Sequence, residues 1–319
     1  DPRGREPGVN ADTAPTDTRP SLPLRPSRTE RRAAGGDSID RRSFLQRTVF
    51  GVPLLIGGTT SLYGALVGRH DYAIEEVPVP LAGLSRRLDG YAIVQLSDIH
   101  FGTFVDDREL DSAVELVRRA QPDLVVLTGD LVDHDPRYAD HLGRLVRRLR
   151  PLARDGVTAI AGNHDYYAGI DAVLTMLRRS GARVLVNQGH TLGDAGGAFA
   201  LLGVDDIWSA RNGVGEGPDL GRALSMVPGD LPRVLLCHNP AFFPEAAGEV
   251  QLQLSGHTHG GQVNVGVQLA HLVLPYGYVA GRYRRGDSLL YVNRGFGTAG
   301  PPARIGAAPE VTRVVLTAG

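Results

Sequence analysis

Five apolar runs of this chain are each followed at once by a short polar cluster that is rich in aspartate, asparagine or histidine. The clusters are Asp98-Ile99-His100, Gly129-Asp130, Gly162-Asn163-His164-Asp165, His238-Asn239 and Gly256-His257-Thr258-His259. The runs have the length and the β-branched and leucine content of buried strands, so each cluster stands at the carboxyl end of a predicted strand. Because ligands bind at that edge of open α/β sheets, we predict an α/β fold in which these five segments converge on one site.

The order of strand and helix patterns sets the expected architecture. β-branched runs predict strands at 91–96, 124–127, 157–161, 184–186, 198–204, 233–237, 251–254, 288–292 and 311–316. Apolar residues at three- and four-residue spacing predict helices at 107–120, 138–152, 171–180 and 220–226. The early alternation of strands and helices implies right-handed crossovers and a largely parallel sheet covered by helices. The strand-rich later part predicts a second, more mixed sheet.

The composition of the 319 residues excludes several classes of site. All 34 basic residues are arginine, which removes the P-loop lysine, Schiff-base lysines and serine-lysine hydrolase arrangements. The single cysteine, Cys237, excludes intrachain disulfides and four-cysteine zinc sites. The net charge of -1 gives no electrostatic footprint for nucleic acid. Any metal must therefore be held by histidine, aspartate, asparagine or glutamate.

The front of the chain has the composition of an export leader. Residues 1–47 are rich in arginine, proline and aspartate and predict a disordered basic tail. Arg41-Arg42-Ser43-Phe44-Leu45 resembles the bacterial twin-arginine motif, with a chance arginine pair as the alternative. The uncharged residues 48–68, about 31 Å long as a helix, predict an export signal or a membrane anchor. On this hypothesis residues 69–319 form one domain outside the cytoplasmic membrane, or anchored to its outer face.

The order and spacing of the five clusters resemble the calcineurin-like metallophosphoesterase superfamily. The resemblance extends from about Tyr72 onward, over roughly 75% of the chain. Flanking residues such as Leu127-Thr128-Gly129 and Gly260-Gly261-Gln262 are similar to its small bacterial phosphodiesterase branch, which has twin-arginine or membrane-anchor leaders. The resemblance implies an αββα sandwich, two packed mixed β-sheets flanked by helices, with residues 69–319 as the catalytic domain.

The family pattern, carried over onto the matching positions, implies a pair of divalent ions (Mn, Fe or Zn) and one unligated histidine. The first ion would be held by Asp98, His100, Asp130 and His259, and the second by Asp130, Asn163, His238 and His257. His164 is implied as the catalytic residue that protonates or stabilises the leaving oxygen. Either Asp133 or Asp165 orients its ring, and the sequence leaves both open.

These implications predict a hydrolase. We expect a hydroxide held between the two ions to attack a phosphodiester or pyrophosphate, of a lipid or an envelope sugar, without a covalent enzyme intermediate. One alternative is a phosphomonoesterase or phosphoprotein phosphatase with the same dinuclear site, and the other is a non-catalytic, membrane-tethered metal-binding module. The expected partners are the phosphate-ester substrate and the membrane, through residues 48–68, or the twin-arginine export machinery. We expect a monomer that binds no nucleic acid.

Other polar residues lie outside these motifs. Cys237 ends an apolar run and is interpreted as a small buried hydrophobe. Asp205 and Asp206 either support the site or cap a turn. Arg294 and Arg304 are either donors to a substrate phosphate or solvated loop residues. Three tyrosines either line a groove for a lipid or sugar or pack without a ligand: Tyr276, Tyr278 and Tyr283. Histidines without a partner motif are left out of the site: His70, His134, His141, His190 and His271.

Overall fold

The computed structural model describes residues 52–264 and 274–319. Val52–Gly319 forms one compact unit. The predicted basic tail and the twin-arginine motif lie outside the described residues. The described part of the predicted leader contains helix α2 (Val52–Leu66), which has 15 residues. Among the residues described, no helix combines the length and the apolar content that crossing a membrane requires.

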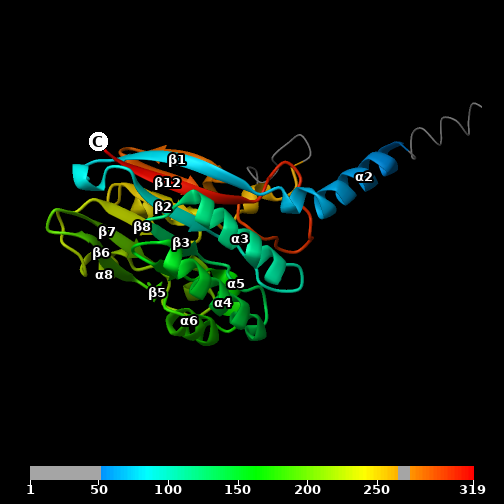
Figure 1. Ribbon diagram of the computed structural model, residues 1–319, viewed down its shortest axis with the longest axis horizontal. Helices are drawn as coiled ribbons and strands as arrows, with labels where there is room; N and C mark the ends of the chain where they lie inside the picture. Colours follow the sequence, from blue (N-terminus) through cyan, green and yellow to red (C-terminus); the bar gives the residue numbers. More distant parts are fainter. Residues whose placement is uncertain (1–51, 265–273) are drawn as a thin grey trace, which may run out of the picture. The chain divides into compact units, whose positions relative to one another are not determined.

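The first sheet contains most of the predicted crossover units (Figure 1). Its strand order is β1 (Ala73–Leu81), β12 (Glu310–Ala318), β2 (Tyr91–Leu96), β3 (Leu124–Thr128), β4 (Val157–Ile160) and β5 (Arg183–Val184). All neighbouring strands are parallel except β12 and β2, which are antiparallel.

The second sheet is antiparallel at both of its outer pairs. Its strand order is β10 (Gly281–Arg285), β11 (Ser288–Val292), β9 (Leu252–Ser255), β8 (Arg233–Leu236), β7 (Gly197–Gly203) and β6 (Gln188–Asp194). The inner pairs are parallel, whereas β10 pairs with β11 and β6 pairs with β7 in antiparallel fashion. The prediction of two mixed sheets is confirmed.

Alternate residues of the first sheet enter two different cores. Val94 and Val125 pack with helices α3 (Asp107–Ala120), α4 (Ala139–Leu149) and α6 (Ile170–Arg179) on the outer face of the first sheet. Ile93 and Leu124 point the other way and pack against β7, β8 and β9. This period of two is the one expected for strands that are buried on both faces.

Short helices cover the outer face of the second sheet. Helices α8 (Leu220–Leu224) and α9 (Phe243–Ala246) pack on residues of β7 and β8 that point away from the first sheet. The layers are therefore helix, sheet, sheet, helix, as the resemblance implies. The other helices described are α5 (Asn163–Tyr167), α7 (Ile207–Arg211), and the 3-10 helices η2 (Gly68–His70), η3 (Arg86–Leu88), η4 (Pro136–Tyr138), η5 (Arg150–Leu152), η6 (Pro240–Phe242), η7 (His259–Gly261) and η8 (Pro275–Gly277).

Helix α3 shows why the predicted helix boundaries match the structure closely. The Asp106 carboxylate accepts from the Arg108 N–H at 2.8 Å, and the Asp106 N–H donates to Glu109 at 3.1 Å. This reciprocal capping box satisfies N–H groups that have no partner within the helix. The helix ends at Gln121, which has a left-handed conformation.

The sequence patterns do not predict strands β1, β6 and β10, and each of these lies at an edge of its sheet. In β1, buried Val77 and Val79 alternate with exposed Pro78 and Pro80. Proline cannot donate a ladder hydrogen bond, but an edge strand needs such bonds on one side only. Proline, which argues against a central strand, therefore marks an edge strand here.

Strand direction places the polar clusters. Strands β2, β3 and β4 lie side by side and parallel in the first sheet, and β8 and β9 do so in the second. Their carboxyl ends lead directly into the five clusters predicted to form the site.

Candidate metal centre and catalytic site

Five of the predicted ligands have the uncommon left-handed backbone conformation, with positive φ. Of the nine non-glycine residues with positive φ in the described part of the chain, five are predicted ligands: Asp98 (51°), His100 (53°), Asp130 (51°), His257 (73°) and His259 (51°). Aspartate and histidine adopt this conformation more readily than most residues, but each instance still costs about 1–3 kcal/mol. Contacts around the site must therefore hold these turns.

Hydrogen bonds tie the turns of the two sheets together. The Asp98 N–H donates to the Gly129 carbonyl at 3.0 Å, and the His100 N–H donates to the Asp130 carbonyl at 3.0 Å. The His257 N–H, from the second sheet, donates to both carboxylate oxygens of Asp98 at 2.9 and 3.1 Å. The segments after β2, β3 and β9 thus form one hydrogen-bonded frame.

Two glycines allow these segments to approach closely. A Cβ atom on Gly256 would lie 2.2 Å from Asp98 Oδ2. A Cβ atom on Gly162 would lie 2.3 Å from Asp130 Oδ1 and 2.8 Å from His238 Nε2. A side chain at either position would therefore displace predicted ligands.

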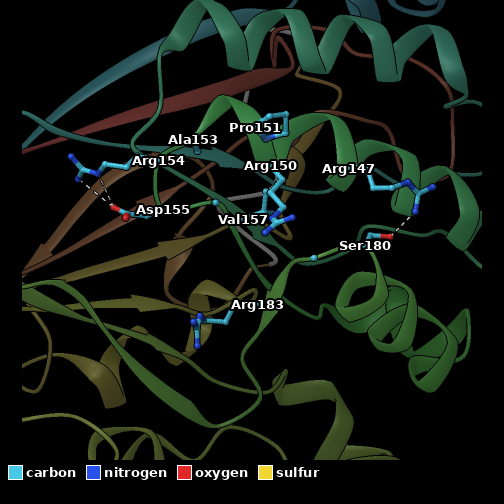
Figure 2. A pocket seen from close by; sticks show the side chains of 11 residues that line it. Arg147, Arg150, Pro151, Ala153, Arg154, Asp155, Val157, Ser180 and Arg183 are labelled. Atoms are coloured by element: carbon cyan, nitrogen blue, oxygen red, sulfur yellow. Dashed lines mark hydrogen bonds and ion pairs between the residues drawn. The ribbon is translucent and has the colours of Figure 1, made fainter.

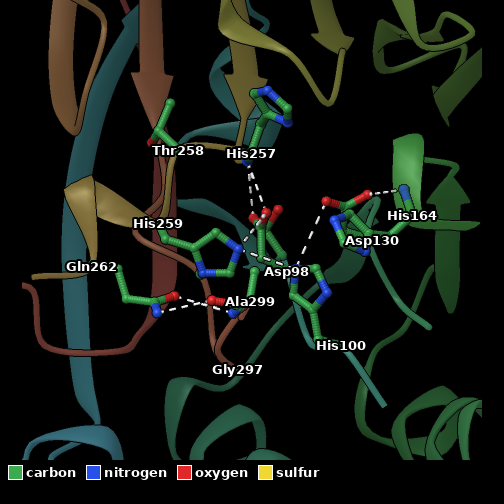
Figure 3. A network of polar contacts seen from close by, with 12 residues as sticks. Asp98, His100, Asp130, His164, His257, Thr258, His259, Gln262, Gly297 and Ala299 are labelled. Atoms are coloured by element: carbon green, nitrogen blue, oxygen red, sulfur yellow. Dashed lines mark hydrogen bonds and ion pairs between the residues drawn. The ribbon is translucent and has the colours of Figure 1, made fainter. Parts of the chain in front are cut away.

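Asp98, His100 and His259 form the first group of candidate ligands (Figure 3). The Nε2 atoms of His100 and His259 lie 3.0 Å apart, and His259 Nε2 lies 3.5 Å from Asp98 Oδ1. All three side chains are buried. Two ring nitrogens that face each other beside a buried carboxylate have the arrangement of ligands around one cation.

Asp130, His238 and His257 form the second group. Asp130 Oδ2 lies 3.2 Å from His238 Nε2, which lies 3.3 Å from His257 Nδ1. His238 Nδ1 is 2.8 Å from the Thr128 carbonyl, and this contact turns Nε2 toward the group. The same Asp130 oxygen lies 3.7 Å from His100 Nε2 of the first group. Asp130 therefore faces both groups, as a bridging ligand must.

Asn163, the remaining predicted ligand, gives an independent test of the fit. Its side chain is buried, and its Oδ1 atom has no hydrogen-bond partner among the described residues. Buried polar atoms are nearly always satisfied, so this oxygen is free to bind a ligand. Carboxylate, amide and imidazole donors without thiolate suit Mn, Fe or Zn. The residues fit a pair of divalent cations, and the role of each as a ligand stays a prediction.

His164 lies beside both groups. Its Nδ1 atom is 3.2 Å from the carbonyl oxygen of Asp133 and 3.2 Å from Oδ1 of the same residue. Its backbone N–H donates to Asp130 Oδ1 at 2.8 Å. The side chain is 20% exposed, and burial lowers the pKa of the imidazole. Because Nδ1 faces Asp133, Nε2 is the ring nitrogen left to meet a substrate.

The sequence leaves open whether Asp133 or Asp165 orients the His164 ring, and the structure places the two carboxylates differently. Asp165 Oδ1 accepts from the N–H groups of Leu131 and Val132 at 2.9 and 3.0 Å, and its Oδ2 accepts from the Gly162 N–H at 2.8 Å. Asp165 therefore ties the turn after β3 to the turn after β4. Asp133 is the carboxylate beside the imidazoles: its Oδ1 lies 3.2 Å from His164 Nδ1 and 3.4 Å from His100 Nδ1.

The charges of the second group support each other. Burial disfavours the charged forms of Asp130 and His238, but their mutual attraction outweighs it. The pKa of Asp130 is held well below its usual value, and that of His238 well above. Burial and the nearby charge of His238 lower the pKa of His257 to about 4. A neutral imidazole is the form that binds a metal, so His257 is already in the binding form, whereas His238 would release a proton when a metal binds.

A sixth segment, which the motifs do not predict, closes the site. The Gly297 N–H donates to the Asp98 carbonyl at 2.8 Å. Arg304 is only 1% exposed; it donates to the Gly297 carbonyl at 2.9 Å, and its Nη2 atom lies 3.2 Å from His259 Nδ1. The glycine- and proline-rich composition of residues 293–306 is the only sequence signal of this role.

Three residues that the motifs leave unassigned have structural positions. Asp206 caps helix α7 by accepting from a backbone N–H of the first turn at 2.8 Å, which agrees with the capping alternative. Arg294 pairs with buried Glu310 at 2.9 Å. Arg304 donates to backbone carbonyl oxygens. Both arginines are therefore engaged within the fold, and buried Arg304 is not a solvated loop residue.

A separate hollow of about 670 Å³ lies at the opposite edge of the first sheet (Figure 2). Its lining comes from residues 147–157 and 180–183, next to the amino ends of β4 and β5. Arginines give it a basic character, but Arg154 pairs with Asp155 and Arg147 donates to Ser180. No predicted ligand lines this hollow, so the candidate chemistry belongs to the carboxyl edge.

Comparisons of the sequence with known proteins give consistent matches. The model of the calcineurin-like phosphoesterase family matches residues 91–261. The uncharacterized metallophosphoesterase YkuE of Bacillus subtilis is 33% identical over 288 residues, covering 87% of this chain and 98% of that protein. An uncharacterized metallophosphoesterase of Aquifex aeolicus is 30% identical, covering 83% and 97%. A transmembrane protein with metallophosphoesterase domain of Danio rerio is 31% identical, covering 82% of this chain and 61% of that protein.

Proposed function

Because the chain belongs to the calcineurin-like phosphoesterase family, we propose that it is a metal-dependent hydrolase that cleaves a phosphodiester or a pyrophosphate. The observation that carries the proposal is the pair of ligand groups that meet at Asp130, with His164 beside them. The choice of a diester follows the resemblance of the flanking residues to the small phosphodiesterase branch.

The side chains divide the proposed reaction between them. Two divalent cations, when bound, would activate water and neutralise charge on the phosphoryl oxygens. Asp130 would fix the separation between the two positions, because its carboxylate faces both ligand groups. The hydrogen-bonded frame holds all donors in place before the substrate arrives, so little reorganisation is needed during the reaction.

His164 would supply the proton to the leaving oxygen. Its Nδ1 atom faces the Asp133 carbonyl and carboxylate, which favour the doubly protonated ring against the effect of burial on its pKa. The donor would be this imidazolium, which would pass its Nε2 proton to the leaving oxygen and become neutral. Such positioned proton transfer contributes about a hundred- to ten-thousandfold in rate.

The experiment compares two chromogenic esters. The purified chain loaded with Mn²⁺ should hydrolyse bis-p-nitrophenyl phosphate faster than p-nitrophenyl phosphate, and EDTA should abolish the activity until Mn²⁺ is restored. His164→Ala should lower kcat by about a hundred- to ten-thousandfold with unchanged metal content. His190→Ala, on β6 outside the site, is the matched control.

Three results would count against the proposal. Hydrolysis of neither ester would refute it. Faster turnover of the monoester would favour the phosphomonoesterase alternative. A fully active His164→Ala variant would refute the role of His164 in proton transfer. If the chain bound metal but showed no metal-dependent turnover, the result would favour the non-catalytic metal-binding module.

We propose further that the protein acts outside the cytoplasmic membrane. The support is in the sequence, where Arg41-Arg42 precedes the uncharged residues 48–68. Changing both arginines to glutamine should retain the protein in the cytoplasm of a host that has the twin-arginine pathway, as cell fractionation would show. Unchanged export of the double variant would contradict the assignment.

A further inference from the structure

A cleft of about 820 Å³ adjoins the site, and the proposed chemistry does not use most of it. Two predicted ligands, Asn163 and His257, belong to its lining, so the cleft opens directly onto the second ligand group. Much of the remaining lining is apolar or aromatic, including Ile207, Trp208 and Tyr278. We call it the aromatic cleft.

The wall of the aromatic cleft begins next to the proposed proton donor. The ring centroid of Tyr167 lies 5.0 Å from that of His164 and 4.5 Å from that of Trp208. Tyr167 and Trp208 both line the cleft. A group bonded to the phosphate would therefore pass from the reacting centre directly onto an aromatic surface.

Two polar side chains of the cleft are engaged within the fold. The Thr258 hydroxyl donates to the Val279 carbonyl, and Asn239 Oδ1 accepts from the Ala241 N–H at 3.0 Å. The charged lining residues, Arg211 and Glu245, are exposed. Recognition of a base or a sugar needs fixed donors and acceptors along the edge of the ligand. The wall of this cleft is mostly apolar and aromatic, which suits a hydrocarbon chain.

We propose that the aromatic cleft binds the hydrocarbon chain of the substrate, which is therefore an amphiphilic phosphate ester. The phosphate would lie at the ligand groups, and the chain would pack against Ile207, Trp208 and Tyr278. This assignment rests on the proposed hydrolase function and selects a lipid-like substrate over a sugar or a nucleotide. Tyr276 and Tyr278 line this cleft, whereas Tyr283 packs on Tyr278.

The test uses diesters that share one leaving group. Methyl, butyl and octyl p-nitrophenyl phosphate all release p-nitrophenolate, and they are compared below micelle-forming concentrations with the Mn²⁺-loaded full chain. Each fully buried methylene is worth roughly fourfold in binding, and a half-buried one roughly twofold. The ratio of kcat/KM for the octyl ester to that for the methyl ester should therefore be on the order of a hundred.

Two variants locate the effect in the cleft. Trp208→Ala should reduce the octyl to methyl ratio about tenfold. Tyr276→Ala should reduce it by about threefold, and because Tyr276 is 67% exposed this substitution should not disturb folding. Met226→Ala removes a side chain that is 48% exposed outside the cleft, and it should leave both the ratio and the activity unchanged.

The outcomes separate this inference from the function on which it rests. A flat chain-length series with ready hydrolysis of the methyl ester would overturn the cleft assignment and leave the hydrolase function standing. A steep series that survives in both variants would also overturn it, as would faster hydrolysis of thymidine 5'-p-nitrophenyl phosphate than of the octyl ester. Hydrolysis of none of the esters would refute the proposed function itself.

Discussion

Asp165 offers the sharpest test of how the site is built. Its carboxylate is fully buried and accepts hydrogen bonds from three backbone N–H groups in two turns that position predicted ligands. Leaving one buried donor unsatisfied costs about 1–3 kcal/mol. Asp165→Ala should therefore lower the free energy of unfolding by about 3–9 kcal/mol, which is comparable to the total stability of a domain.

Asp165→Asn keeps the prediction measurable if the alanine variant does not fold. The asparagine oxygen can still accept from Leu131 and Val132, but its amide nitrogen would face the Gly162 N–H, so one hydrogen bond is lost. The expected loss is about 1–3 kcal/mol. Asp111→Asn is the matched control, because Asp111 is 71% exposed and its ion pair should contribute less than about 1 kcal/mol.

The assay is urea unfolding of the metal-free variants at constant pH and ionic strength. Equal unfolding free energies of Asp165→Asn and Asp111→Asn would contradict the structural role of Asp165. A variant Asp165→Asn that is as stable as the wild type but has lost proton transfer to the leaving group would assign the orienting role to Asp165.

Two other substitutions test contacts at and beyond the site. Asp133→Asn should lower kcat about tenfold or more with little change in stability, because the carboxylate faces the imidazoles of His164 and His100 rather than the backbone. Unchanged kcat would contradict this role. Gly68→Ala should lower the melting temperature, because a Cβ atom there would lie 2.1 Å from the Arg304 carbonyl oxygen. Gly57→Ala, whose added Cβ would have no atom of the described residues within 4 Å, is its control and should be neutral or stabilising. Equal melting temperatures of the two glycine variants would refute the packing argument.

Local signals account for the parts of the fold that the sequence predicted. The central strands are continuous apolar runs that end in polar residues, and α3 is bounded by a capping box. Each of these signals lies within a few residues of the feature that it predicts. Because parallel neighbours share a carboxyl edge, the convergence of the five clusters followed from the strand pattern.

The edge strands and the sixth site segment lack such local signals. Strands β6 and β10 are polar, because β6 has a single buried residue and β10 has none. Strand β1 contains two prolines. The sequence leaves Arg304 either as a donor to a substrate phosphate or as a solvated loop residue. It is buried instead, and backbone carbonyl groups of Arg294 and Gly297 accept its hydrogen bonds. A contact made only by tertiary packing has no trace in the neighbouring sequence.

The conformation of the ligands shows the same limit most clearly. The motifs name Asp98 and His257 but cannot predict that both have positive φ. An isolated segment would leave this strained conformation, because nothing in the neighbouring sequence holds it. The Asp98 turn is held by the Gly129 carbonyl within its own sheet and by the His257 N–H, which reaches the Asp98 carboxylate from the other sheet. The full set of these contacts exists only when β2 and β9 are assembled. We infer that ligand geometry is a property of the complete sandwich, so that metal affinity should fall with any substitution that loosens the contact between the sheets.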